Sequence, residues 1–246
     1  MYRYFIELAF DGTRYHGWQI QKNADSVQAR LNHALSTLFR KPIETVGCGR
    51  TDTGVHAKQL FAHFDIAYEC NNEHLQRINA LLPHDITAKQ LLLVANHAHA
   101  RFDANTRSYE YHIHFLKNPF LHQKSWWFRH GTCLDVDAMN QAAMLLQQRT
   151  DFSCFSKSNT QTHTNNCHIH QAHFTTTTEG LLFTITADRF LRNMVRAIVG
   201  TLIEVGKNKM LIDDLPKLIL SKNRSEAGAS VPACGLYLTQ VTYPYL

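Results

Sequence analysis

Gly47-Cys48-Gly49-Arg50-Thr51-Asp52-Thr53-Gly54-Val55-His56-Ala57 is a stretch with three glycines that follows a strand-like run at 43–47. Glycines let the backbone of a loop approach a ligand closely. The stretch holds one carboxylate, Asp52, two residues from one guanidinium, Arg50. The adjacent positive charge favours an ionised Asp52, which suits a nucleophile or an anionic base. The structural alternative is a turn in which Asp52 makes a local side-chain hydrogen bond.

The segments around this loop alternate between strand and helix patterns. Residues 2–10 alternate as a strand, and apolar residues recur at helical spacing after Asp25 and Ser26, which are the candidates for the N-cap. A helix is also predicted around 75–82, after Asp135, and from about 189 to 205, and strands are predicted at 43–47, 59–65, 86–94, 107–115, 167–174 and 181–187. The patterns predict an α/β (α+β) fold of two lobes, residues 1–104 and 105–246.

Composition and charge narrow the class of protein. The chain has 246 residues, 44% hydrophobic and 18% charged, which excludes a disordered chain. It holds 25 Lys and Arg against 20 Asp and Glu, a net charge of +5 that is compatible with a nucleic-acid partner. No apolar run of about 20 residues predicts a membrane span, and the first residues do not resemble a signal peptide. Six cysteines without a C-x-x-C pair predict reduced thiols and a cytoplasmic protein.

A second segment combines arginines with aromatic residues. Arg101, Arg107, Tyr109 and Tyr111 are assigned to a predicted strand, and the two tyrosines share a face because they are two residues apart. Aromatic rings beside guanidinium groups hold an unstacked base along a phosphate backbone. The structural alternative is a half-buried strand with a ladder of tyrosines.

A third segment places Arg189, Arg192 and Arg196 at spacings of three and four residues. On the predicted helix this spacing puts the three guanidinium groups on one face, opposite the core. They require counter-charge from phosphates, from a carboxylate such as Asp52, or from water alone. A solvated helix face is therefore the alternative to a binding surface.

Two weaker features have plainer interpretations. Trp18, in a predicted loop, could stack on a ligand, although such a tryptophan more often fills an irregular core. The cysteines and histidines at 154, 163, 167, 168, 170 and 173 match no standard zinc spacing, so no metal is predicted.

Taken together, six short motifs in order resemble the TruA family of tRNA pseudouridine synthases over nearly the whole chain. Residues 49–57 resemble the catalytic signature of that family. The other five are the tripeptide 17–19, Arg107-x-Tyr109-x-Tyr111, the tripeptide 151–153, residues 194–200 and residues 235–238. Each is weak alone, whereas six in sequence are specific.

The resemblance implies a role for each residue. Asp52 is the essential aspartate, Tyr109 packs against the target uracil, Arg196 orients Asp52, and Arg50 helps to open the RNA helix. Arg107, Arg189 and Arg192 are expected to contact RNA. The implied fold has two lobes of mixed, mostly antiparallel sheet with a basic cleft. The implied enzyme is a homodimer that modifies uridines 38, 39 and 40 of tRNA without a metal or organic cofactor.

One residue departs from the family pattern, and two rival functions would use the same segments. Cys167 stands where family members commonly have an arginine, which places in doubt the tRNA contact expected there. A non-catalytic RNA-binding protein would use Asp52 only as a turn residue. A metal-dependent hydrolase would use the Cys- and His-rich segment 154–173. Cofactor-free isomerisation of uridine explains more of the motifs.

Overall fold

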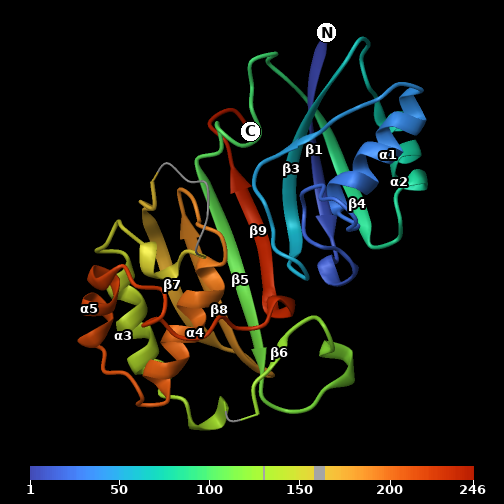
Figure 1. Ribbon diagram of the computed structural model, residues 1–246. Helices are drawn as coiled ribbons and strands as arrows, with labels where there is room; N and C mark the ends of the chain where they lie inside the picture. Colours follow the sequence, from blue (N-terminus) through green and yellow to red (C-terminus); the bar gives the residue numbers. More distant parts are fainter. Residues whose placement is uncertain (130, 158–163) are drawn as a thin grey trace. The chain divides into compact units, whose positions relative to one another are not determined.

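A computed structural model describes residues 1–129, 131–157 and 164–246 of the chain (Figure 1). Within these ranges the chain forms five α-helices and nine strands, and most strand pairs are antiparallel. The predicted mixed, mostly antiparallel α/β fold class is therefore confirmed. The chain divides into two compact units, the first comprising residues 1–105 and 237–246 and the second residues 106–236.

The first unit is built on a sheet in which the strand order is β4-β1-β3-β9. Its strands are β1 (Tyr2–Phe10), β3 (His56–Ile66), β4 (Ile86–Val94) and β9 (Leu236–Thr242), and the short β2 (Val46–Gly47) pairs with β3. β1 is antiparallel to both neighbours, whereas β9 is parallel to β3. Phe5 and Ile6 point to opposite faces of β1 and are both fully buried, so both faces of the strand are covered. For this reason apolar and polar residues do not alternate strictly along β1, as they would in a strand with one face in solvent.

Two helices belong to the first unit, α1 (Val27–Phe39) and α2 (Asn72–Leu81). The Ser26 side chain accepts a hydrogen bond from Ala29 N at 3.3 Å, which confirms the predicted N-cap of α1. The 3₁₀ turn Gly12–Arg14 follows β1. α2 packs against β4 and α1 against α2, as seen beside β4 in Figure 1.

The second unit contains the antiparallel sheet β5-β8-β7. Its strands are β5 (Thr106–His114), β7 (Ile169–Thr176) and β8 (Gly180–Ala187), and the short β6 (Trp126–Trp127) pairs in parallel with β5. β7 and β8, which pair with each other, correspond to the strands predicted at 167–174 and 181–187.

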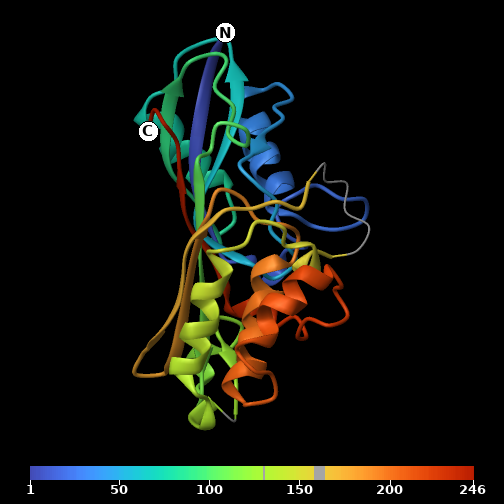
Figure 2. The same cartoon turned by 90° about the vertical axis from the view of Figure 1, so that its left-hand side faces the viewer.

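Three helices of the second unit lie together on one side of its sheet, namely α3 (Val136–Leu146), α4 (Met194–Gly206) and α5 (Asp214–Ser221) (Figure 2). Asp135 caps α3 as predicted, because its carboxylate accepts from Ala138 N at 2.9 Å. In the described part of this unit there are also four 3₁₀ turns, at Pro119–Leu121, Gly131–Cys133, Ser153–Phe155 and Ala233–Gly235.

The end of the chain returns to the first unit. The sequence predicted that all of residues 105–246 form a second lobe, whereas residues 237–246 group with the first unit. Tyr237 and Leu238 pair with the first residues of β3, and Tyr243 donates its hydroxyl to Ala100 O at 2.6 Å. Pairing with distant strands, rather than sequence proximity, decides where this segment lies.

Candidate active site

The loop that carries Asp52 joins β2 to β3 in the first unit. Its entry is held by a hydrogen bond from Cys48 N to Phe61 O at 2.8 Å. Its exit is a turn in which Val55 N donates to Asp52 O at 3.2 Å and Gly54 adopts a positive φ of 78°. Because β2 and β3 pair in antiparallel fashion, the chain has to reverse its direction within residues 48–55. Asp52 is half-buried in this loop, and Arg50 is exposed.

A second backbone segment, residues 15–18, supports the Asp52 loop. Trp18 N donates to Thr51 O at 3.4 Å, and Gly54 N donates to Tyr15 O at 3.2 Å. Gly17 has φ 87°, and a Cβ atom at this position would lie 2.2 Å from Thr51 O. Only glycine permits both this conformation and this close approach. The two motifs around Gly17 and Asp52 are thus parts of one structure.

The sequence left two roles open for Trp18, stacking on a ligand or filling the core. The structure shows that it fills the core. Its side chain is 2% exposed. A Cβ atom on Gly47 would lie 2.5 Å from the indole ring, so the ring packs directly on the glycine at the end of β2. The indole therefore fills the space under the loop.

His56, the first residue of β3 after the Asp52 loop, has no function predicted from the sequence. It is 1% exposed, and Gly12 N donates to its Nδ1 at 3.1 Å. A carboxylate oxygen of Asp11 lies 3.0 Å from the same nitrogen, and the His56 ring stacks on Tyr237 with a centroid distance of 4.5 Å. His56 thus links the β1 turn, the Asp52 loop and β9. The sequence signal that could have indicated a buried His56 is its position directly after the apolar residue Val55.

Tyr109 lies on β5 of the second unit, opposite Ile185 of β8. It is half-buried, and its ring meets the edge of Phe190 at a centroid distance of 5.1 Å. Tyr111, on the same face of the strand, is fully buried and donates its hydroxyl to Pro232 O at 2.7 Å. Tyr111 is therefore a core residue, whereas Tyr109 is only half-buried. Phe190 was counted as a helix residue in the sequence and not as a partner of Tyr109.

Two of the three arginines in the predicted helix lie outside it. α4 begins at Met194, so Arg189 and Arg192 precede it and do not share a helix face with Arg196. The Asp188 carboxylate accepts from Arg189 N at 2.7 Å and from His168 N at 2.8 Å, which fixes the chain in a non-helical conformation. Asn193 then adopts φ 67° at the N-cap. The prediction of a continuous helix from about 189 was wrong.

Arg101 was likewise placed on a strand, but β5 begins at Thr106. Arg107 does lie on β5, where its guanidinium donates to Asp188 O at 2.8 Å. This bond joins β5 to the segment that carries Arg189 and Arg192. Arg107 and Arg189 are half-buried, and Arg192 is exposed.

Arg196 lies in the first turn of α4, next to the segment at 228–231. Its Nε donates to Val231 O at 2.7 Å, and Val231 N donates to Arg196 O at 3.2 Å. Gly200, one turn later, permits this packing, because a Cβ atom there would lie 1.9 Å from Ala229 O. The two bonds fix the direction in which the guanidinium leaves the helix.

The predicted site residues fall into two groups. Arg50 and Asp52 are on one loop of the first unit. Arg107, Tyr109, Arg189, Arg192 and Arg196 belong to the second unit, on β5 and on the chain from the end of β8 into α4. The pairing of Asp52 with Arg196 stays a prediction. The group in the second unit, a half-buried tyrosine with several arginines, suits an anionic ligand with a planar ring.

The Cys- and His-rich segment provides no metal site in the parts of the chain that the structure describes. One of its members, His163, lies outside the described residues. Cys167 is fully buried, and burial raises the pKa of its thiol to about 12. No helix within the described ranges is long and apolar enough to cross a membrane.

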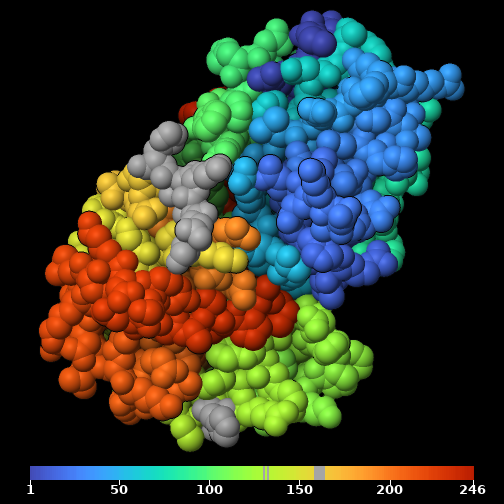
Figure 3. Space-filling model, in the orientation of Figure 1, coloured from blue at the N-terminus to red at the C-terminus, as the bar shows by residue number. Residues whose placement is uncertain are grey.

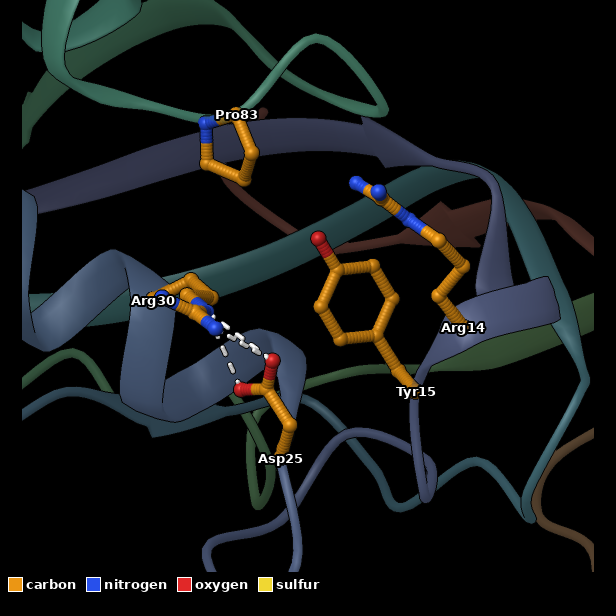
Figure 4. A pocket seen from close by; sticks show the side chains of 5 residues that line it. All are labelled: Arg14, Tyr15, Asp25, Arg30 and Pro83. Atoms are coloured by element: carbon orange, nitrogen blue, oxygen red, sulfur yellow. Dashed lines mark hydrogen bonds and ion pairs between the residues drawn. The ribbon is translucent and has the colours of Figure 1, made fainter.

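A pocket of about 270 Å³ lies close to the support of the Asp52 loop, lined by Arg14, Tyr15, Asp25, Arg30 and Pro83 (Figure 4). Arg30 pairs with Asp25 at 2.6 Å, and Arg14 pairs with Asp85 at 2.7 Å. Burial, followed by the hydrogen bond to Asp85, raises the pKa of Tyr15 to about 12. Because each guanidinium has a carboxylate partner, the pocket offers no unbalanced charge to an anion.

Comparison with known proteins identifies the family. A family model described as tRNA pseudouridine synthase matches residues 142–244. The chain is 49% identical over 245 residues to tRNA pseudouridine synthase A of Bacteroides fragilis, covering 98% of this chain and 96% of the relative. It is 48% identical over 249 residues to the Porphyromonas gingivalis protein of that name, covering 99% and 98%. The Limosilactobacillus reuteri protein of that name is 37% identical over 252 residues, covering 99% and 97%. The chain therefore belongs to the tRNA pseudouridine synthase A family.

Proposed function

We propose that this protein isomerises uridine to pseudouridine at positions 38, 39 and 40 of the anticodon stem-loop of tRNA. Its family makes it a catalytic tRNA pseudouridine synthase, an isomerase, rather than a non-catalytic RNA-binding protein. The choice of these three positions rests on the resemblance of residues 49–57 to the signature of the family. The single observation that carries the proposal is the half-buried carboxylate of Asp52 on a backbone braced by Gly17.

The reaction explains why a carboxylate is needed. The N1–C1′ bond of uridine breaks, the uracil turns, a C5–C1′ bond forms, the proton on C5 is lost and N1 gains a proton, so no redox partner or group donor is required. Asp52 attacks C6, attacks C1′ or removes the 2′ hydrogen, and each of these steps needs an anionic oxygen. The backbone on both sides of Asp52 is hydrogen-bonded to residues 15–18, and this restricts where the carboxylate can lie relative to the uracil ring.

The other groups serve the flipped nucleotide. A uracil in a stem is inaccessible, and extruding it costs a few kcal/mol. Stacking on Tyr109, whose ring is held by Phe190, returns about 1–3 kcal/mol of this cost. In this proposal Arg196 pairs with and orients Asp52, Arg50 occupies the space that the nucleotide leaves, and Arg107, Arg189 and Arg192 contact phosphates.

The assembly and location are part of the same proposal. We expect a cytoplasmic homodimer in which the first unit supplies the Asp52 loop and the second unit supplies Tyr109 and Arg196. Light scattering of the pure protein measures its molar mass and so tests the homodimer directly. A mass of a single chain at micromolar concentration would contradict the homodimer.

The test is a map of pseudouridine in tRNA that has been treated with the protein. Unmodified tRNA transcripts are incubated with pure protein and no added metal, labelled with a carbodiimide that marks pseudouridine, and analysed by mass spectrometry. Marks confined to positions 38–40 are expected. Marks at other positions would contradict the proposed target, and unmarked tRNA would contradict the activity.

A further inference from the structure

The segment between β4 and β5 presents a phenylalanine ring to solvent, and this segment forms part of the surface in green in Figure 3. Phe102 is 74% exposed. The ring of His99 lies against it with a centroid distance of 4.2 Å and an interplanar angle of 30°, and the Arg101 guanidinium lies 5.7 Å from its centroid. Single exposed apolar residues are common on protein surfaces, but few have a histidine ring and a guanidinium group against them.

The backbone under the ring is held unusually firmly for an exposed segment. Nδ1 of His99 accepts from the backbone N–H groups of Arg101 and Phe102 at 3.1 and 3.2 Å. The Asp103 carboxylate accepts from His99 N at 2.8 Å and from the Tyr245 hydroxyl at 2.9 Å. The backbone that carries Phe102 is therefore ordered before any ligand arrives, which lowers the entropic cost of binding.

Two residues from other parts of the first unit hold the middle of the segment. Ala100 N donates to Nδ1 of His63 on β3 at 3.1 Å, and Ala100 O accepts from the Tyr243 hydroxyl at 2.6 Å. Both partners are buried. The segment is thus fixed to the sheet and to the end of the chain, while Phe102 points outward.

We propose that Phe102, backed by His99, is a platform on which an unpaired base of tRNA stacks. A base stacks on an exposed aromatic ring whatever its identity, and the adjacent positive charge of Arg101 suits a polyanion better than it suits an apolar protein surface. This inference rests on the proposed function, because it takes tRNA as the ligand.

The platform contacts a nucleotide other than the target uridine. Its anchor, His63, is seven residues along β3 from His56, which follows the Asp52 loop. Seven residues of strand span roughly 23 Å. Phe102 is therefore a binding residue that affects affinity for tRNA and leaves the chemical step unchanged.

The experiment compares tRNA affinity among four full-length proteins by fluorescence anisotropy at fixed salt: native, Phe102→Ala, Phe102→Trp and Phe120→Ala. Phe120 is the matched control, because it is 90% exposed and lies in the second unit. Phe102→Ala should weaken binding about 5- to 100-fold with an unchanged single-turnover rate at saturation. Phe102→Trp should bind like the native protein and show emission that tRNA quenches beyond the native tryptophan signal. Unchanged melting temperatures establish that all four are folded.

Several outcomes would overturn the platform. The first is native affinity for tRNA in Phe102→Ala, and the second is an equal loss of affinity in Phe102→Ala and Phe120→Ala. The third is a halved molar mass of Phe102→Ala in light scattering, which would assign the ring to a contact with a second copy of the chain. Pseudouridine formation by the native protein is measured in the same preparations. Its absence would refute the proposed function, whereas an active native protein with unaffected Phe102→Ala binding would refute only the platform.

Discussion

At the scale of single residues, the position of Asp52 depends on a glycine in another segment. Gly17 has the left-handed backbone conformation and contacts the carbonyl of Thr51, the residue before Asp52. A side chain at this position meets backbone rather than the flexible end of another side chain. The sequence signature around residue 17 is therefore a structural requirement of the loop at residue 52.

Gly17→Ala should lower the free energy of unfolding by about 1–3 kcal/mol, because it adds both backbone strain and a clash. Gly49→Ala is the control within the supported loop, since a Cβ atom there has no described atom within 4 Å. Urea unfolding of both variants measures the difference. Equal stability of the two would show that the contact between residues 17 and 51 does not constrain the loop.

At the scale of elements, local rules predicted most helices and strands. Ser26 and Asp135 begin helices as their side chains indicate, and the run at 86–94 is the strand β4. The rules failed at residue 189, because apolar spacing continues through a turn in which Met194 N donates to Leu191 O. The carboxylate of Asp188, from the end of β8, decides that conformation, and periodicity does not register such a contact.

The stability of the protein should depend on pH through His63, the residue of β3 that accepts a hydrogen bond from Ala100 N. Burial, followed by the charge of Arg3, lowers the pKa of His63 to about 4 from an ordinary value near 6.5. Asp65 and Asp103 act in the opposite direction and His99 in the same one. The unfolded chain therefore binds a proton at His63 that the folded protein does not, so stability falls as the pH drops from about 6.5 to 4.

His63→Asn keeps an acceptor near the position of Nδ1 and removes the titration. We expect the variant to lose less stability than the native protein between pH 6.5 and 4, as measured by urea unfolding at several pH values. Parallel losses in the two proteins would show that His63 is not protonated on unfolding.

At the scale of the whole molecule, the sequence predicted the family and two lobes, but it did not predict the return of residues 237–246 to the first unit. The parallel pairing of β9 with β3 joins residues about 180 positions apart, and no local pattern encodes such a pairing. The same limit applies to Phe190 and Val231. They support Tyr109 and Arg196 through contacts that only the folded chain provides.

Affinity for tRNA should fall steeply with salt, because cations on the protein displace counterions from phosphates. Arg192→Gln, at an exposed position, should reduce the slope of log Kd against log salt concentration by about one. Lys217→Gln is the control, since Lys217 is an exposed cation paired with Asp214 on α5. A slope unchanged in Arg192→Gln, or reduced equally in both variants, would remove Arg192 from the RNA surface.

The most direct measurement is the release of tritium from tRNA that contains uridine labelled at C5, because only loss of the C5 proton liberates it. The native protein should release tritium without added cofactor. Asp52→Asn has nearly the same shape but no negative charge, so it should bind tRNA with near-native affinity and release none above background. Tritium release by Asp52→Asn at a rate close to that of the native protein would contradict the assignment of Asp52 as the catalytic group.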